Sequence, residues 1–230
     1  LRMDDASGTT TWTYDAAGRP VGETQSRAGR QLTSTYDAAS LRTSLTVSSS
    51  EISNPAISNL PSWTTTYAYD AAARLHAVLD PRVSAKPFLY TYDTRASVVA
   101  QLAMPTGQTI AYARDAQGRL LSTTLSGTAR QTLATHAYTY DLAGQRTTAS
   151  TASATTAYTY DALRQLATAT ETPAGTGQTP AREFAYAYDP IGNRLTAATA
   201  TETTAYTANS VNQYTSIVSQ ISNSQISDTP

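Results

Sequence analysis

The sequence contains no cysteine, and other residue types that build active sites are scarce. Without cysteine the chain can form no disulfide bond, no thiolate zinc site and no thiol nucleophile. The two histidines, His76 and His136, lie far apart in the sequence and make a poor metal site without a third ligand. There is also no glycine-rich phosphate loop, no nucleophile elbow and no His-Glu-x-x-His motif. We therefore expect no catalytic residue, no metal and no cofactor.

Charge of one sign and long apolar segments are lacking as well. The 16 Lys and Arg residues are balanced by 17 Asp and Glu residues, and the basic residues form no run. Such a chain lacks the basic surface that a nucleic-acid backbone requires. No stretch approaches the 18 consecutive apolar residues of a membrane-spanning helix, so we expect no membrane insertion. The chain begins at Leu1 without a signal-peptide pattern, and we interpret it as a piece of a longer protein.

The usual core-forming residues are few. Leu, Ile, Val and Phe together account for 34 of the 230 residues, whereas there are 41 Thr and 39 Ala. Threonine favours strands, and the 15 tyrosines supply most of the large side chains. We therefore expect a β protein whose core is built around tyrosine.

A short unit, aromatic-x-Tyr-Asp, recurs nine times along the chain, with Asn in place of Asp in the last copy. Successive copies are separated by 22, 33, 23, 22, 26, 20, 28 and 20 residues. Weaker copies contain Tyr36, Tyr112 and Tyr206. Six copies have both rings: Trp12 and Tyr14, Tyr67 and Tyr69, Tyr90 and Tyr92, Tyr138 and Tyr140, Tyr158 and Tyr160, and Tyr186 and Tyr188.

Each unit has the pattern of a β-hairpin. Side chains two apart on a strand share a face, so both rings should form part of an aromatic ladder on one face of a sheet. The aspartate can cap backbone N–H groups of a tight turn, and a glycine three residues later accepts the positive φ that closes the turn. An arginine one or two residues further on can cover a ring or pair with the turn aspartate. The predicted turn residues are Asp15, Gly18, Asp37, Asp70, Asp93, Asp115, Gly118, Asp141, Gly144, Asp161, Asp189 and Gly192.

A single hairpin is only marginally stable in water, so the hairpins should pair side by side into one continuous antiparallel sheet. We expect this array of about nine units to span residues 1–215, with insertions at 44–63 and 171–183. Residues 216–230 are expected to form a polar tail or an inter-repeat loop. Copies of an Ile-Ser-Asn motif in the first insertion and in the tail are interpreted as low-complexity loop.

The repeated Tyr-x-Tyr-Asp-x-x-Gly-x-Arg unit resembles the YD repeat of the RHS (rearrangement hot spot) proteins. The best copies lie at 14–19, 113–120 and 188–195, and the resemblance covers roughly residues 10–215. It implies that the strip of hairpins winds into a spiralling sheet that forms part of a hollow shell. In polymorphic toxins and toxin-complex subunits of this family the shell encloses a C-terminal toxic domain. Related teneurins use the shell for adhesion, and some bacterial surface proteins carry YD arrays with proposed carbohydrate-binding roles.

One segment matches the letters of the motif Asp-Pro-x-Gly at the end of the family's toxin-releasing core. Asp189 and Pro190 begin this match, but Asn193, Arg194 and a further repeat follow. Because a motif needs its structural context, we interpret the segment as the turn of an ordinary unit.

The resemblance predicts a structural function. The chain would be a segment of an RHS/YD-repeat shell in a large secreted or surface-exposed bacterial protein, and it would scaffold or enclose a C-terminal effector without being an enzyme. Its partners would be the remainder of its own chain and the enclosed domain. The alternative is a carbohydrate-binding or adhesive module at the cell surface, with exposed rings such as Trp63 stacking on a glycan.

Overall fold

A computed structural model describes residues 1–6, 8–26, 29–49, 61–94, 97–175 and 179–221. These residues form nineteen strands, and no helix occurs among them. The predicted all-β fold of tandem hairpins is thus confirmed. The first ten strands are β1 (Arg2–Asp5), β2 (Gly8–Tyr14), β3 (Pro20–Gln25), β4 (Arg30–Tyr36), β5 (Arg42–Ser49), β6 (Trp63–Tyr69), β7 (Leu75–Leu79), β8 (Phe88–Tyr92), β9 (Val99–Ala103) and β10 (Thr109–Arg114).

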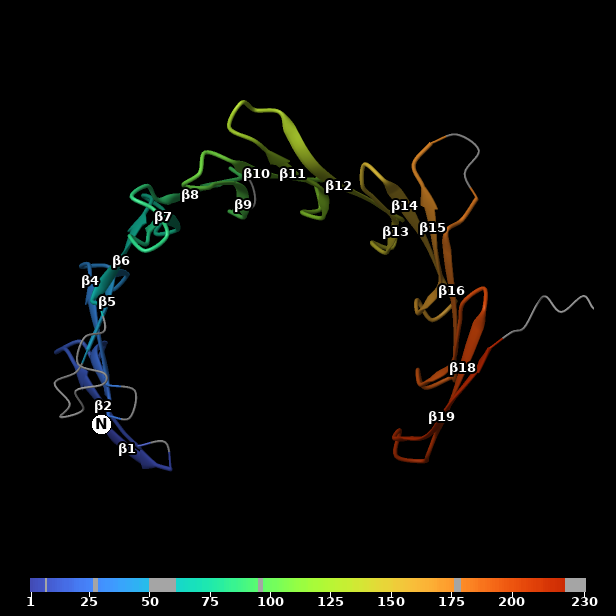
Figure 1. Cartoon of the computed structure of the whole chain (residues 1–230), viewed down its shortest axis with the longest axis horizontal. Helices are drawn as coiled ribbons and strands as arrows, with labels where there is room; N and C mark the ends of the chain where they lie inside the picture. Colours follow the sequence, from blue (N-terminus) through green and yellow to red (C-terminus); the bar gives the residue numbers. More distant parts are fainter. Residues whose placement is uncertain (7, 27–28, 50–60, 95–96, 176–178, 222–230) are drawn as a thin grey trace, which may run out of the picture. The chain divides into compact units, whose positions relative to one another are not determined.

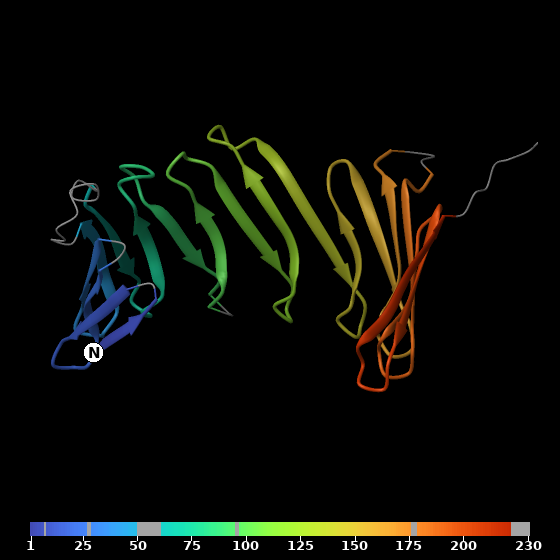
Figure 2. The same ribbon diagram turned by 60° about the horizontal axis from the view of Figure 1, so that its bottom comes forward.

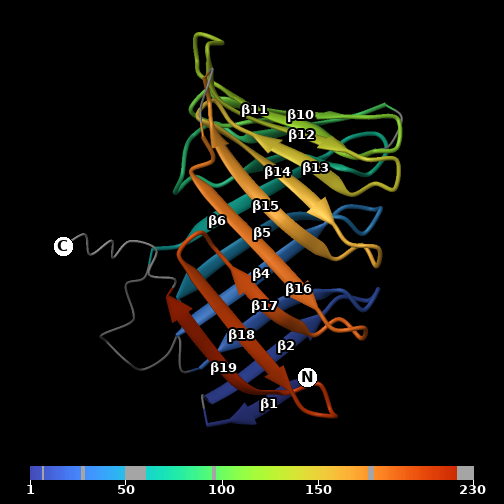
Figure 3. The ribbon, with the colours of Figure 1, turned by 90° about the vertical axis from the view of Figure 1, so that its right-hand side faces the viewer.

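The remaining strands are β11 (Leu120–Ser126), β12 (Thr132–Tyr140), β13 (Arg146–Ser150), β14 (Ala154–Tyr160), β15 (Leu166–Pro173), β16 (Arg182–Tyr188), β17 (Arg194–Ala198), β18 (Glu202–Ala208) and β19 (Tyr214–Ile221). The chain divides into two compact units, Leu1–Ala111 with Gly127–Gln131 and Tyr112–Ser126 with Thr132–Pro230. In the first unit each strand from β1 to β10 pairs antiparallel with the next one in sequence (Figure 1). In the second unit the strands from β11 to β19 do the same (Figure 3).

Each Tyr-x-Tyr-Asp repeat lies at the C-terminal end of an even-numbered strand, from β2 to β18. Each of these strands leads through its Asp turn into the following odd-numbered strand. Since all strands of a meander alternate in direction, the Asp turns of a unit lie at the same edge of its sheet. We call this the turn edge.

A register shift accompanies the second ring of the repeat. In the β6–β7 hairpin, Tyr67 lies opposite Val78 and Ala68 opposite Ala77, but Tyr69 lies opposite Leu75. The same shift precedes Tyr140 in the β12–β13 hairpin. This is the bulge that a type I turn followed by a left-handed residue introduces into a hairpin.

Each unit is a single layer of strands (Figure 2), and its side chains alternate in exposure. Tyr67 and Tyr69 are half-buried, whereas Ala68 between them is exposed. Among the described residues the buried side chains are Ala169 and Ser34, each 9% exposed. The expected tyrosine core is therefore not formed within either unit, because the rings line one face of a single layer.

Several strands extend past the boundaries expected from the sequence. β5 continues to Ser49 and β15 to Pro173, so the strands occupy part of both expected insertions. β19 runs on to Ile221, beyond the expected end of the array at residue 215. The β-branched Ile217, Val218 and Ile221 account for this extension, since such side chains favour strands. Most of the Ile-Ser-Asn copies fall at 50–60 and 222–230, outside the described residues.

Candidate functional site

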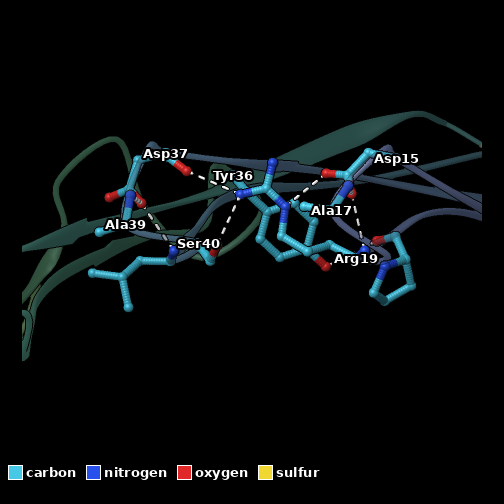
Figure 4. A network of polar contacts seen from close by, with 9 residues as sticks. Asp15, Ala17, Arg19, Tyr36, Asp37, Ala39 and Ser40 are labelled. Carbon is cyan, nitrogen blue, oxygen red and sulfur yellow. Dashed lines mark hydrogen bonds and ion pairs between the residues drawn. The ribbon is translucent and has the colours of Figure 1, made fainter.

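The turn edge carries a repeated set of polar contacts, in which the side-chain oxygen of the Asp or Asn that begins a turn caps the backbone. Asp15 Oδ1 accepts hydrogen bonds from the N–H groups of Ala17 and Arg19, both at 2.9 Å (Figure 4). Asn209 places its amide oxygen in the same way, 3.0 Å from the nitrogens of Val211 and Gln213. An oxygen acceptor, and not the charge, is thus what the cap requires. The same pair of bonds is made by Asp37, Asp70, Asp115, Asp161 and Asp189, and Asp141 accepts from the N–H of Gln145.

The residue three positions after the aspartate adopts a left-handed conformation in these turns. In the first turn Gly18 has φ of 77° and its N–H donates to Asp15 O at 3.0 Å, while Asp15 N–H donates to Arg19 O at 3.0 Å. Glycine pays no steric cost there, but an L-residue does. The sequence also predicted turns without glycine, at Asp37, Asp70 and Asp161, but it assigned a positive φ only to glycine. Ser40, Ala73, Arg164 and Asn212 adopt the same left-handed conformation.

The hydrogen bonds at the turns lower the pKa of several turn carboxyls below the usual 3.8. For Asp15 the largest cause is the backbone hydrogen bond from Arg19, and for Asp70 it is the side-chain hydrogen bond from Arg74. For Asp189 the largest cause is the side-chain hydrogen bond from Asn193, an uncharged partner. The lowered pKa values keep these carboxylates ionised as hydrogen-bond acceptors under ordinary conditions.

An arginine four residues after the aspartate joins its own turn to the next one. Arg19 Nε lies 2.6 Å from Asp15 Oδ2, and its Nη1 donates to the carbonyl of Asp37 in the following turn at 3.1 Å (Figure 4). Its guanidinium carbon also lies 4.9 Å from the ring centroid of Tyr36. Arg119 makes the same three contacts, with Asp115, the carbonyl of Asp141 and the ring of Tyr140, and Arg74 pairs with Asp70 and covers the ring of Tyr92.

Where this position is not arginine, an amide occupies it in four repeats, and in two of them the amide donates to the next turn. Gln145 Nε2 donates to the carbonyl of Arg164 in the next turn at 3.1 Å. Asn193 Nδ2 donates to Oδ1 of Asn212 in the next turn at 3.3 Å. The second repeat has the apolar Leu41 at this position instead.

In five repeats the second tyrosine joins its hairpin to the preceding one through a hydrogen bond of its hydroxyl. The Tyr36 hydroxyl donates to the carbonyl of Pro20 at 2.8 Å, and the Tyr69 hydroxyl donates to that of Arg42 at 2.9 Å. In each case the acceptor is the first residue of the odd-numbered strand in the preceding hairpin. The other bonds of this type run from Tyr92 to Leu75, from Tyr140 to Leu120 and from Tyr160 to Arg146. We call the tyrosine hydroxyl bond and the arginine contacts together the hairpin latch.

A second arginine position, five residues after the aspartate, has a different role. The Arg146 guanidinium lies 4.3 Å from the ring centroid of Tyr138, the first ring of its own repeat. Arg194 covers Tyr186 in the same way at 4.9 Å. Sequence reasoning treated the arginines after the turn as one group. A shift of one residue along a strand directs the side chain to another neighbour. The latch arginines therefore cover a ring of the next repeat, whereas Arg146 and Arg194 cover a ring of their own repeat.

The other candidate residues from the sequence are not brought together. His76 and His136 are both exposed, and His76 Nδ1 lies 3.2 Å from the carbonyl oxygen of Tyr90. Within the described part of the chain, no three His, Asp or Glu side chains are grouped so that they could hold a metal ion. No helix long and apolar enough to cross a bilayer occurs there either. Trp63, suggested as a stacking surface, has the Arg82 guanidinium 4.2 Å from its ring centroid, so one ring face is covered.

These contacts define a class of protein, a tandem β-hairpin repeat array without a core of its own. The model of the RHS repeat family matches residues 1–30. The fold matches the crystal structure of TcdB2-TccC3-Cdc42 with a TM-score of 0.59 and 16% identity over 93% of this chain. It also matches the Photorhabdus luminescens Tc holotoxin pore with a TM-score of 0.56 and 16% identity over 94% of this chain. No curated protein matches the sequence.

The nine-copy repeat and the family match over residues 1–30 support the resemblance to the RHS/YD-repeat family, and the solved structures show the shared fold. The chain spans only 13% of the length of those two matched chains. Its described residues form the tandem β-hairpin repeat that the sequence predicted.

Proposed function

We propose that this chain is a wall segment of an RHS shell in a larger secreted or surface-exposed protein, and that the shell encloses a C-terminal effector domain. The observation that carries this proposal is the hairpin latch. Tyr36, Tyr69, Tyr92, Tyr140 and Tyr160 each tie their hairpin to the one before it. Contacts between successive hairpins, repeated along the chain, suit a continuous wall.

The half-exposed tyrosine face supports the same function. A single-layer sheet normally buries one face against another layer. Here the rings are only half-buried within each unit, so an additional surface is needed to cover them. An enclosed domain or another part of the same long chain would supply that surface. The wall would act by enclosure and scaffolding and would have no catalytic step of its own.

Limited proteolysis of the full-length parent protein with mass spectrometry tests this proposal. We expect a C-terminal fragment that resists protease while the wall is native and is digested once the wall is unfolded. The same C-terminal domain, expressed alone, is the matched control and should be digested under native conditions. Progressive degradation of the parent with no protected fragment would contradict enclosure and favour an adhesive array.

A further inference from the structure

The second repeat lacks a ring that the other repeats have. The position three residues before the turn Asp or Asn holds Ser34 in this repeat. Elsewhere the same position holds Trp12, Tyr67, Tyr90, Tyr112, Tyr138, Tyr158, Tyr186 and Tyr206. The aromatic ladder along this face of the first unit therefore lacks one ring between Trp12 and Tyr67.

A hollow of about 360 Å³ lies where the ring is missing. It is lined by Trp12, Leu32, Ser34, Arg42 and Leu45, among others. Ser34 is only 9% exposed and lies opposite Leu45 in the β4–β5 pair, so the serine lies deep in the sheet surface. The volume is within the range of small-molecule sites, and the lining combines the apolar Trp12, Leu32 and Leu45 with the polar Glu23, Ser34 and Arg42.

Arg42 lacks the ring that its position covers in other repeats. Arg42, Arg146 and Arg194 all lie five residues after the turn aspartate. Arg146 and Arg194 lie 4.3 and 4.9 Å from the first ring of their own repeats. In the second repeat that ring is replaced by Ser34, and the Arg42 guanidinium lies 6.0 Å from the centroid of a different ring, Tyr36.

We propose that this hollow, the Ser34 slot, binds a phenol-type aromatic ring supplied from outside the two flanking repeats. The ring would occupy the place that Tyr138 and Tyr186 occupy in their own repeats, with Arg42 over its face. A guanidinium is attracted to the face of an aromatic ring, and Leu32 and Leu45 provide apolar contact. Glu23 also lines the hollow, and its Oε1 accepts a hydrogen bond from Gln25 Nε2 at 2.6 Å. This inference does not depend on enclosure of a cargo.

The ring could be a tyrosyl side chain of another polypeptide or a free small phenol. Both share the same chemistry, and two probes distinguish them. p-Cresol is the tyrosine side chain without its backbone, and N-acetyl-tyrosinamide carries the flanking amides. Binding of both probes would indicate a tyrosyl side chain as the natural occupant, whereas binding of p-cresol alone would indicate a free phenol.

Calorimetric titration of the full chain with each probe tests the proposal. We expect a dissociation constant on the order of 1 mM for p-cresol, given its few non-hydrogen atoms. Ser34→Tyr restores the ring from within and should weaken binding at least about tenfold. Ser34→Ala keeps the hollow and should bind like the unmodified chain. Arg42→Met keeps the length of the side chain without its charge and should weaken binding about two- to fivefold.

Nuclear Overhauser contacts from p-cresol to the side chains of Trp12 and Leu45 in the unmodified chain locate the site without any substitution. Their observation supports the slot even if Ser34→Tyr fails to fold. Three results would overturn the proposal. These are no binding of p-cresol at millimolar concentration, unchanged binding in folded Ser34→Tyr, or binding of methyl glucoside in the slot with no binding of either phenol.

Discussion

The hydroxyl of Tyr36 donates a hydrogen bond to the carbonyl of Pro20 at 2.8 Å, so a side chain of one hairpin closes on the backbone of the hairpin before it. Arg19 lies over the same ring and reaches the carbonyl of Asp37. One tyrosine thus takes part in both halves of the latch. Because the described residues form no interior core, such contacts between neighbouring hairpins have to supply much of the order in the array.

Removing one tyrosine hydroxyl should weaken the array measurably. Tyr140→Phe keeps the ring under Arg119 but leaves the carbonyl of Leu120 without its donor. We expect a loss of about 0.5–1.5 kcal/mol in the free energy of unfolding, measured by chemical denaturation. Tyr14→Phe is the matched control, because Tyr14 is 46% exposed and its hydroxyl has no partner among the described residues. Equal losses in the two variants would contradict the latch.

The left-handed turn position predicts a reciprocal pair of substitutions. Ala73 has φ of 60°, so Ala73→Gly should relieve strain and raise stability by about 0.5–1 kcal/mol. Gly144 has φ of 85°, and a Cβ added there would meet no neighbouring atom. Gly144→Ala should therefore lower the free energy of unfolding by about 1 kcal/mol through backbone strain, without a steric clash. Thermal unfolding of both variants checks the pair. Destabilisation by Ala73→Gly would show that the turn conformation is not a source of strain.

Stability should fall in acid as the turn carboxylates become protonated. The pKa of Asp70 is lowered in the folded chain by the side chain of Arg74, so ionised Asp70 stabilises the fold. This contribution is fully present above the unfolded pKa, near 3.8, and is lost as the pH falls through the lower folded pKa. We expect the melting temperature to drop below about pH 4.

Asn substitution provides the control for this pH dependence. Asn209 shows that an amide oxygen makes the same backbone bonds, so Asp15→Asn and Asp70→Asn combined should keep the caps. The double variant should be less stable than the unmodified chain at neutral pH, and its melting temperature should depend less on pH in acid. An identical pH profile for the two proteins would exclude these carboxylates as its source.

The hairpins and turns could be predicted because their cause is local. The Tyr-x-Tyr alternation specifies a strand, and Asp followed by Gly18 or Gly144 specifies the turn. The same local logic predicted turns at Asp70 and Asp161 but not the left-handed conformation of Ala73 and Arg164, since that conformation follows from the hairpin geometry and not from the residue. Tertiary context imposed a conformation that these residues disfavour when isolated.

The latch could be anticipated only in part. The sequence suggested that arginine covers a ring or pairs with aspartate, and Arg19 does both. Which ring it covers depends on the next hairpin, 18 to 22 residues away, and on the bulge that sets the side-chain direction. The significance of Ser34 was likewise hidden, because a missing ring matters only when the neighbouring rings are placed in space.

The measurement that tests the latch most directly is a double-mutant cycle between Arg119 and Tyr140 in the full chain. Arg119→Gln, which mimics Gln145, and Tyr140→Leu are made singly and together, and unfolding free energies are compared. The loss of the tyrosine hydroxyl bond cancels, because Tyr140→Leu removes it whichever residue occupies position 119. We predict a coupling energy of about 0.5–1 kcal/mol, which would show that the two hairpins hold each other through this contact. Additive effects, with no coupling beyond error, would contradict the account.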